Sequence, residues 1–358
     1  MPAPAVPHRR IVELDALRAM AAINLVLFHF THVYAVKFGY SSPLGFEWPY
    51  GAYGVELFFI LSGFVNAMSL LRRGQPTNFL LARFIRIAPI FWIAIGVNAC
   101  IAGMAPLSEF PVSGSQWLAN LTLMPKIFGF DCVDPVMWTL QIEMLFYGIL
   151  TVLYVSGALK RPVLTWAAMV TASLLVCPLH DSWIAAGESG MHVQFAGIVR
   201  RIMLLDFIPL FGIGFLLYMI KIGKGPMWRN LCGILLAAAV FHSIDHGKHN
   251  PLATALIIGL VTLSAYGKIP LLRFRIFVWI SAISYPLYLF HNNLGTVLIH
   301  RFDQAGVAPV VAMCIALVFS IALAILVTTR IEQPLTRYLR NRFLEGRIAA
   351  AKRASANS

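Results

Sequence analysis

Residues 13–32 read ELDALRAMAAINLVLFHFTH, an apolar run that contains Arg18 and His29. Eleven positions along an α-helix correspond to about three turns and about 16 Å of rise, so the two side chains lie on nearly the same face. The run predicts a membrane-spanning helix with Arg18 near one membrane edge and His29 near the midplane. An ionisable group at that depth indicates a functional site. Because imidazole can transfer a proton near neutral pH and arginine keeps its charge, the pair predicts a buried base above an anion clamp.

The composition of the whole chain predicts an all-α membrane protein, a polytopic bundle of about ten transmembrane helices. Of the 358 residues, 59% are hydrophobic and 12% are charged, and the mean hydropathy is +0.76. Soluble domains do not have such a composition. The expected spans are 19–36, 51–70, 79–103, 136–156, 162–180, 202–221, 229–245, 251–267, 276–299 and 309–329.

The basic residues orient these spans and predict that both termini are cytoplasmic. With the N-terminus inside, 22 of the 28 lysines and arginines fall on the inner side, as the positive-inside rule requires. The net charge of +13 then reflects topology and contact with membrane lipids, and we expect no nucleic-acid binding. One transmembrane domain over 1–335 is followed by a basic cytoplasmic tail over 336–358. The N-terminal segment lacks a signal-peptide cleavage site, so the first helix is expected to stay as an anchor.

The five cysteines show no paired spacing of the CxxC kind. This pattern predicts neither a metal site nor a redox motif. Cys132 and Cys177 could form a disulfide if both face the outer side, although we do not expect one.

Three further polar residues are predicted at a depth similar to that of His29. At 1.5 Å per residue in a core of roughly 30 Å, Glu56, Glu143 and His291 fall with His29 in a slab about 7 Å thick. Such groups face the bundle interior or a wet cavity, so we expect them to converge. His29 with a carboxylate partner would be a general base that takes a proton from a hydroxyl attacking an acyl carbonyl. The alternative is a histidine that only bonds to a neighbouring helix.

Arg83 and Arg86, in LLARFIRIAP over 80–89, share one helix face near the inner edge. Together with Arg18 they could bind a phosphorylated ligand from the cytoplasm, since guanidinium groups bind phosphate through two donors. The alternative is that they only anchor the helix by the positive-inside rule. Ser62 and Gly63 are expected to serve close helix packing.

These residues lie in six motifs that, in order, resemble those of the acyltransferase-3 family of integral-membrane O-acyltransferases. Departures from the family pattern are Ala19 for glycine, Glu56 for aspartate and Thr139 for serine, none of which removes a proposed catalytic group. The motifs are Leu14–Arg18 with His29, Gly54–Phe64, Arg83–Arg86 with Pro89, Trp138–Glu143 with Phe146 and Tyr147, Ile283–His291, and Glu332–Pro334.

The resemblance implies transfer of an acyl group, often acetyl, from cytoplasmic acyl-CoA to a hydroxyl of a carbohydrate such as a surface or exported glycan. It also implies a multi-pass protein of the bacterial cytoplasmic (inner) membrane, with acetyl-CoA as the expected co-substrate and no permanently bound cofactor. On this hypothesis the catalytic residues are His29, Glu143 and Arg18, the donor-binding residues are Arg18, Arg83 and Arg86, and the substrate-binding residues are Glu56, Ser62, Trp138, Tyr285 and His291.

Two other functions are open at this point. A proton-coupled transporter would use His29, Glu56 and Glu143 as a relay, and its sequence would carry paired broken helices in two halves. A non-catalytic membrane sensor or scaffold would keep the fold without the chemistry, although the presence of Arg18, His29 and Glu143 argues against it.

Overall fold

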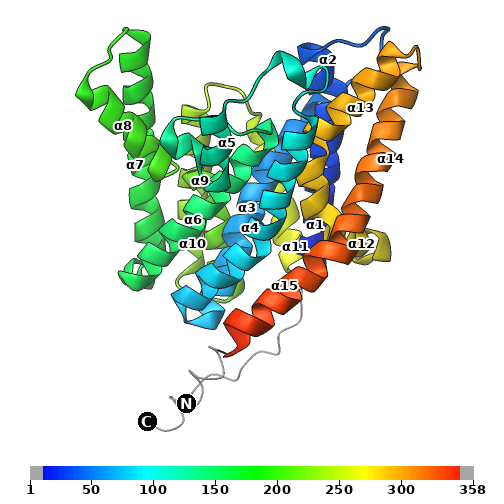
Figure 1. The fold of residues 1–358 in the computed structure, drawn as a ribbon. Coiled ribbons are helices and arrows are strands. Elements are labelled where there is room, and N and C mark those ends of the chain that lie inside the picture. Colours follow the sequence, from blue (N-terminus) through cyan, green and yellow to red (C-terminus); the bar gives the residue numbers. More distant parts are fainter. Residues whose placement is uncertain (1–10, 347–358) are drawn as a thin grey trace.

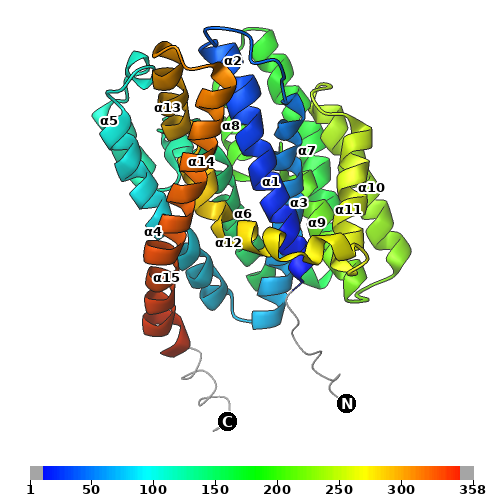
Figure 2. The ribbon, with the colours of Figure 1, turned by 90° about the vertical axis from the view of Figure 1, so that its right-hand side faces the viewer.

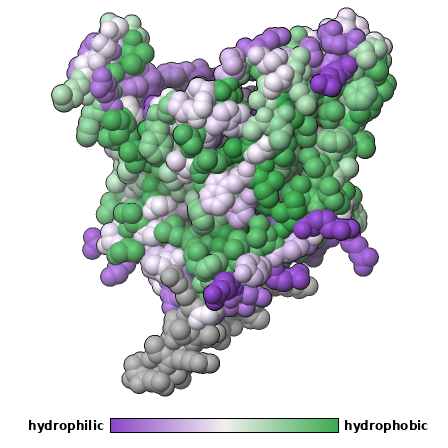
Figure 3. Space-filling model, in the orientation of Figure 1, coloured by the Kyte–Doolittle hydropathy of each residue, from purple (hydrophilic) through white to green (hydrophobic). Residues whose placement is uncertain are grey.

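The computed structural model describes residues 11–346, and every regular element in that range is helical. The long helices stand side by side in a bundle (Figures 1 and 2). Hydrophobic side chains cover the middle of the visible face, and polar side chains gather at its two ends (Figure 3). A bundle with an apolar belt between two polar rims has the surface of a multi-pass membrane protein.

Fifteen α-helices, some joined without a break by short π-helical turns, make up the described chain. They are α1 (Val12–Phe28), α2 (Tyr34–Lys37), α3 (Tyr53–Arg73), α4 (Pro76–Ile101), α5 (Gly114–Leu121), α6 (Trp138–Val155), α7 (Pro162–Ala185), α8 (Met191–Ile202), α9 (Ile208–Lys221), α10 (Met227–Ile244), α11 (Pro251–Ala265), α12 (Arg275–Phe290), α13 (Asn292–Gln304), α14 (Pro309–Val327) and α15 (Gln333–Leu339).

Seven helical segments of the described chain are long and apolar enough to cross a membrane. The other three expected spans correspond to the shorter apolar helices α9, α11 and α12, which have 14, 15 and 16 residues. The all-helical membrane fold is therefore confirmed, whereas ten crossings and cytoplasmic termini stay predictions.

One expected span, 276–299, is divided into two helices. α12 ends at Phe290 and α13 begins at Asn292. Polar partners explain the division: Asn292 Nδ2 donates to Asp134 Oδ1 (2.9 Å), and Asn293 Nδ2 donates to Asn98 Oδ1 (2.7 Å). Buried amides and carboxylates require such partners. These hydrogen bonds hold the backbone in place at the break between α12 and α13.

Other boundaries also differ from the prediction: the first span begins at Val12 instead of 19, and the fifth ends at Ala185 instead of 180. The span expected from 202 starts at Ile208, because Leu204 adopts a left-handed conformation (φ 55°) that separates α8 from α9. The last span continues beyond 329 through α15 to Glu345 as one helical rod (Figure 1). The predicted tail is thus helical over 336–345, and its part over 347–358 lies outside the described residues.

Close packing at the centre of the bundle depends on two glycines. A Cβ atom on Gly63 of α3 would lie 2.1 Å from the Phe211 carbonyl oxygen, and one on Gly214 of α9 would lie 1.9 Å from that of Ile60. Small residues that let two backbones approach are typical of membrane helix pairs. This confirms the packing expected for Gly63. Helices α1, α3, α6 and α12 contribute residues to both of the cavities described next.

Candidate active site

Two neighbouring cavities lie along α1. The arginine cavity has a volume of about 70 Å³ and is lined by Arg18, Arg83, Arg86, Glu143, Tyr147 and Tyr285, among others. The histidine cavity, of about 520 Å³, is lined by His29, Trp138, Phe207, Asp245 and His249, among others. Leu25, Val55 and Tyr288 belong to the walls of both. Arg18 and His29 therefore face neighbouring spaces, as their spacing on one helix face predicts.

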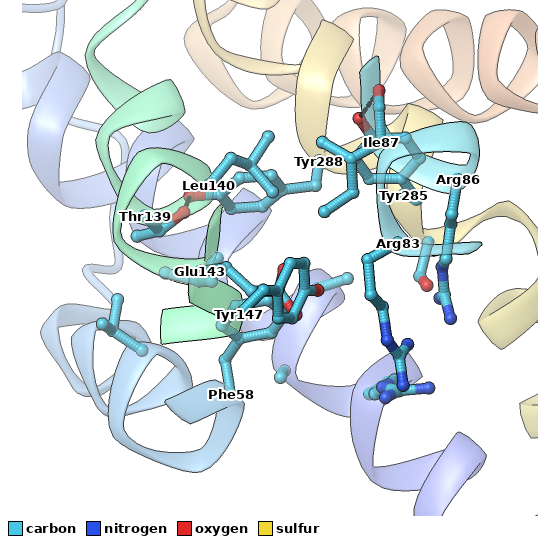
Figure 4. Close-up of a pocket in the computed structure, with 16 residues that line it drawn as sticks. Phe58, Arg83, Arg86, Ile87, Thr139, Leu140, Glu143, Tyr147, Tyr285 and Tyr288 are labelled. Atoms are coloured by element: carbon cyan, nitrogen blue, oxygen red, sulfur yellow. Dashed lines mark hydrogen bonds between the residues drawn. The ribbon is translucent and has the colours of Figure 1, made fainter. Parts of the chain in front are cut away.

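The arginine cavity is a cationic site with an aromatic wall. Arg83 and Arg86 extend from α4 on the same side, and Glu143 and Tyr147 approach from α6 (Figure 4). The Arg83 guanidinium lies 5.4 Å from the centre of the Phe79 ring and 5.6 Å from that of Tyr147. Guanidinium groups stack on aromatic faces in this way and keep their donors at the edge.

Arg18 contributes the third cation, and it is paired at 3.7 Å with Asp15 one turn earlier on the same helix. Three guanidinium groups and one lining carboxylate, Glu143, leave the arginine cavity positive. Phosphate groups bind where several guanidinium donors converge.

Glu143 lines the arginine cavity, whereas the sequence predicted a carboxylate partner for His29. Its Oε1 accepts a hydrogen bond from Ser62 Oγ (3.0 Å), and Asn66 Nδ2 donates to the same hydroxyl (2.8 Å). Ser62 is 2% exposed and supports Glu143 from α3. Tyr285 lines the same cavity while its hydroxyl donates to the Ile87 carbonyl oxygen (2.7 Å).

His29 stands where α1 passes into a π-helical turn, His29–Val33, and such turns occur often at functional sites. Its Nδ1 lies 2.8 Å from the Leu25 carbonyl oxygen and 3.1 Å from Nε2 of His291. His291 is fully buried, and its own Nδ1 lies 3.1 Å and 2.8 Å from the carbonyl oxygens of Leu287 and Tyr288. The partner of His29 is thus a second histidine on the break between α12 and α13, in place of the expected carboxylate.

These contacts assign the tautomers of both rings. Because carbonyl oxygens only accept hydrogen bonds, Nδ1 carries the proton in each imidazole. His291 Nε2 is then a bare nitrogen that accepts from His29 Nδ1. In neutral His29 the lone pair is on Nε2, the nitrogen that a general base would use.

The fourth residue of the predicted slab, Glu56, belongs to a separate group. Its Oε2 accepts a hydrogen bond from Thr254 Oγ1 (2.6 Å), and its Oε1 lies 3.8 Å from His249 Nε2. The slab residues therefore divide between Glu143 at the arginines, the His29–His291 pair, and Glu56 with His249. Trp138 lines the histidine cavity.

A buried carboxylate outside the spans supports the His291 break. Asp134 is 1% exposed and accepts from Asn292 Nδ2, from the Asn293 amide (3.2 Å) and from the Val136 amide (3.2 Å). Burial raises the pKa of Asp134 to about 6, against the opposite effect of these hydrogen bonds. Neither Cys132 nor Cys177 forms a disulfide, so the pairing that the sequence left open is not formed.

Sequence reasoning missed three features of this site. It did not pair His29 with His291, because the neighbourhood of helices far apart in the sequence is not visible in one chain. It did not single out Asp134, or the group of Asp245 and His249 in the wall of the histidine cavity. For the last there was a signal: two histidines and an aspartate in the six residues DHGKHN at 245–250.

The family model described as an acyltransferase domain matches residues 11–329. The chain belongs to the acyltransferase-3 family. It is 26% identical over 321 residues to the exopolysaccharide production protein ExoZ of Rhizobium meliloti, covering 86% of this chain and 97% of that protein. No solved structure matches the chain.

Two further relatives are longer proteins of which this chain matches a part. One is the putative peptidoglycan O-acetyltransferase YrhL of Bacillus subtilis, 26% identical over 48% of this chain and 28% of that protein. The other is the peptidoglycan O-acetyltransferase OatA of Listeria monocytogenes, 26% identical over 39% of this chain and 23% of that protein. Family and relatives together identify a membrane-embedded O-acyltransferase, and they favour this enzyme over the transporter and the non-catalytic scaffold.

Proposed function

We propose that the protein transfers an acyl group, with acetyl as the first expectation, from cytoplasmic acyl-CoA to a hydroxyl of a carbohydrate, and that His29 is the general base. The observation that carries the proposal is the order of sites along α1. Three arginines line one cavity, and the neighbouring cavity holds an imidazole whose Nε2 is bare. The relatives named for O-acetylation and exopolysaccharide production support a glycan acceptor.

In this mechanism the arginine cavity holds the donor. Arg18, Arg83 and Arg86 would bind phosphate groups of CoA through charge-assisted hydrogen bonds, each contributing about 1.5–3 kcal/mol. Glu143, held by Ser62, lines the same cavity. The thioester would extend along α1 toward His29, over about 16 Å of helix rise.

At the histidine cavity, Nε2 of His29 takes the proton of the acceptor hydroxyl as its oxygen attacks the thioester carbonyl carbon. A C–O ester bond forms, the C–S bond breaks, and Nε2–H returns the proton to the leaving thiolate. While His29 is protonated, the Leu25 carbonyl oxygen and His291 Nε2 accept from its Nδ1–H. His291 is thus a positioning residue, with the role that a carboxylate has in many histidine-centred sites.

The test is transfer of radiolabel in membrane vesicles that contain the host's glycan. We expect acetyl-CoA labelled in the acetyl group to give base-labile label in the glycan fraction with the wild type and none with His29→Ala. Equal labelling with both proteins would remove His29 from the mechanism. No labelling of glycan by the wild type with either acetyl-CoA or succinyl-CoA would overturn the proposed donor and acceptor.

A further inference from the structure

The segment between α10 and α11 forms a polar part of the wall of the histidine cavity. Asp245, His246, Lys248 and His249 all line the cavity that also holds His29. The acyl-transfer step described above uses none of them. Their presence beside the proposed base raises the question of what they bind.

His249 is held in one orientation. Asp245 Oδ1 lies 2.7 Å from its Nδ1, and Asp245 Oδ2 accepts from its backbone amide at 2.7 Å. The rings of Phe241 and Tyr53 lie 5.6 Å and 5.8 Å from the imidazole centre. Since a carboxylate only accepts, Nδ1 carries a proton and Nε2 is the nitrogen left for another partner.

The rest of the segment is anchored to two other helices. The Asn250 amide donates to the Tyr53 hydroxyl of α3 (3.0 Å), and His246 Nε2 lies 3.1 Å from Asp181 Oδ2 of α7. His246 and Gly247 adopt left-handed conformations (φ 54° and 76°), which cost energy in a non-glycine residue and persist only when surrounding contacts hold them. A wall held in this way is suited to recognition, because little freedom is lost when a ligand binds.

Glu56 supplies a second polar atom without a partner. Its side chain is 2% exposed, Thr254 satisfies Oε2, and Oε1 has no hydrogen-bond partner among the described residues. His249 Nε2, at 3.8 Å, is too distant from Oε1 for a hydrogen bond. A hydroxyl oxygen about 2.8 Å from His249 Nε2 would accept a hydrogen bond from it when Nε2 also carries a proton, and would donate its own proton toward Glu56 Oε1.

We propose that His249, oriented by Asp245 and backed by the buried Glu56, forms a second contact for the acceptor and binds another hydroxyl of the molecule that reacts at His29. The assignment rests on the proposed function. It selects a polyol such as a sugar over an alcohol with one hydroxyl, and the rings of Trp138 and Phe207 offer apolar wall in the same cavity. Pockets with a few placed polar groups on an aromatic lining are typical ligand sites, and 520 Å³ is within the usual size of about 300–1,000 Å³.

The experiment measures labelled acetyl transfer to the host's surface glycan after its esters are removed with mild base, over a range of glycan concentrations. His249→Phe keeps a ring between Phe241 and Tyr53 but has no polar atom. We expect it to raise the KM for glycan about tenfold, as the loss of a buried hydrogen bond of about 1.4 kcal/mol would. The kcat at saturating glycan and the KM for acetyl-CoA should stay within about threefold of wild type, because the reacting groups are untouched.

Two variants and one control complete the test. His249→Gln keeps a donor and should recover most of the affinity for glycan. Asp245→Asn, which replaces His249→Phe as the test if that variant does not fold, should raise the KM for glycan by a smaller factor. His192→Phe changes an exposed histidine of α8 that pairs with Glu188, and it should leave all three constants unchanged. A wild-type KM for glycan in both His249→Phe and Asp245→Asn would overturn the second contact. Absence of label with the wild type would overturn the proposed function, and the second contact with it.

Discussion

The arginine cavity and the histidine cavity lie side by side on α1 but differ in how they hold their key groups. The first is small, positive and built from charged side chains with an aromatic wall. The second is several times larger, and the imidazole of His29 in its wall is oriented by the Leu25 carbonyl and by the imidazole of His291. A neighbouring carboxylate would favour the protonated imidazole. In the proposed mechanism, charge would serve anion binding in the arginine cavity, and neutral hydrogen bonds would keep His29 available as a base.

The largest effect is expected from a variant that removes the proposed base of the histidine cavity and leaves the arginine cavity intact. His29→Ala should lower kcat by at least about 10²-fold, the usual contribution of a general base. The KM for acetyl-CoA should stay near the wild-type value, because the arginine cavity is unchanged. Initial rates in vesicles at several acetyl-CoA concentrations give both constants. A raised KM with unchanged kcat would show that His29 binds the donor instead.

Arg86→Gln removes one charge from the arginine cavity, the proposed donor site. We expect the KM for acetyl-CoA to rise about 10- to 100-fold, which corresponds to the loss of one charge-assisted contact of about 1.5–3 kcal/mol. The KM for glycan should not change. Arg72→Gln, at an exposed arginine near the end of α3, is the matched control and should leave both constants unchanged. Equal effects of the two variants would mean that the arginines act only through membrane topology.

The variants His291→Gln and His291→Asn test whether His291 orients His29 by accepting its hydrogen bond. The Gln side chain can place an acceptor near the position of Nε2, whereas Asn is too short to reach His29. Because the Leu25 carbonyl oxygen still holds Nδ1, we expect only about a tenfold loss of kcat in His291→Asn, and near-normal kcat in His291→Gln. Neither should change the KM for acetyl-CoA. Equal losses in both variants, with unchanged melting temperatures, would contradict the acceptor role of His291.

The smallest effect concerns stability at the break between α12 and α13, which Asp134 supports. The pKa of Asp134 is raised by burial to about 6, so the fold favours its protonated form, and this contribution is lost as the pH rises from about 4 to 6. It is at most about 3 kcal/mol for a shift of roughly two pKa units. The melting temperature of the purified wild type should fall over this range more steeply than that of Asp134→Asn. Asp131→Asn, at a side chain that is 88% exposed, should behave like the wild type.

The sequence predicts the fold class and both ends of the site, because apolar length and the spacing of Arg18, Arg83, Arg86 and His29 are local properties. It does not predict which helices are neighbours. The carboxylates Glu56 and Glu143 are predicted at a depth similar to that of His29, yet depth alone does not identify His291 as the partner of His29. That contact depends on the end of α12, which Asp134 and two asparagines fix from distant segments.

The proposal that the arginines bind the donor while His29 acts as the base is tested most directly by equilibrium binding of radiolabelled acetyl-CoA to the purified protein and its variants. The account predicts that His29→Gln binds acetyl-CoA as tightly as the wild type while transferring no label to glycan. Arg86→Gln should bind it at least about tenfold more weakly. Loss of acetyl-CoA binding in His29→Gln, together with wild-type binding in Arg86→Gln, would contradict the assignment of donor binding to the arginines and of base chemistry to the histidine.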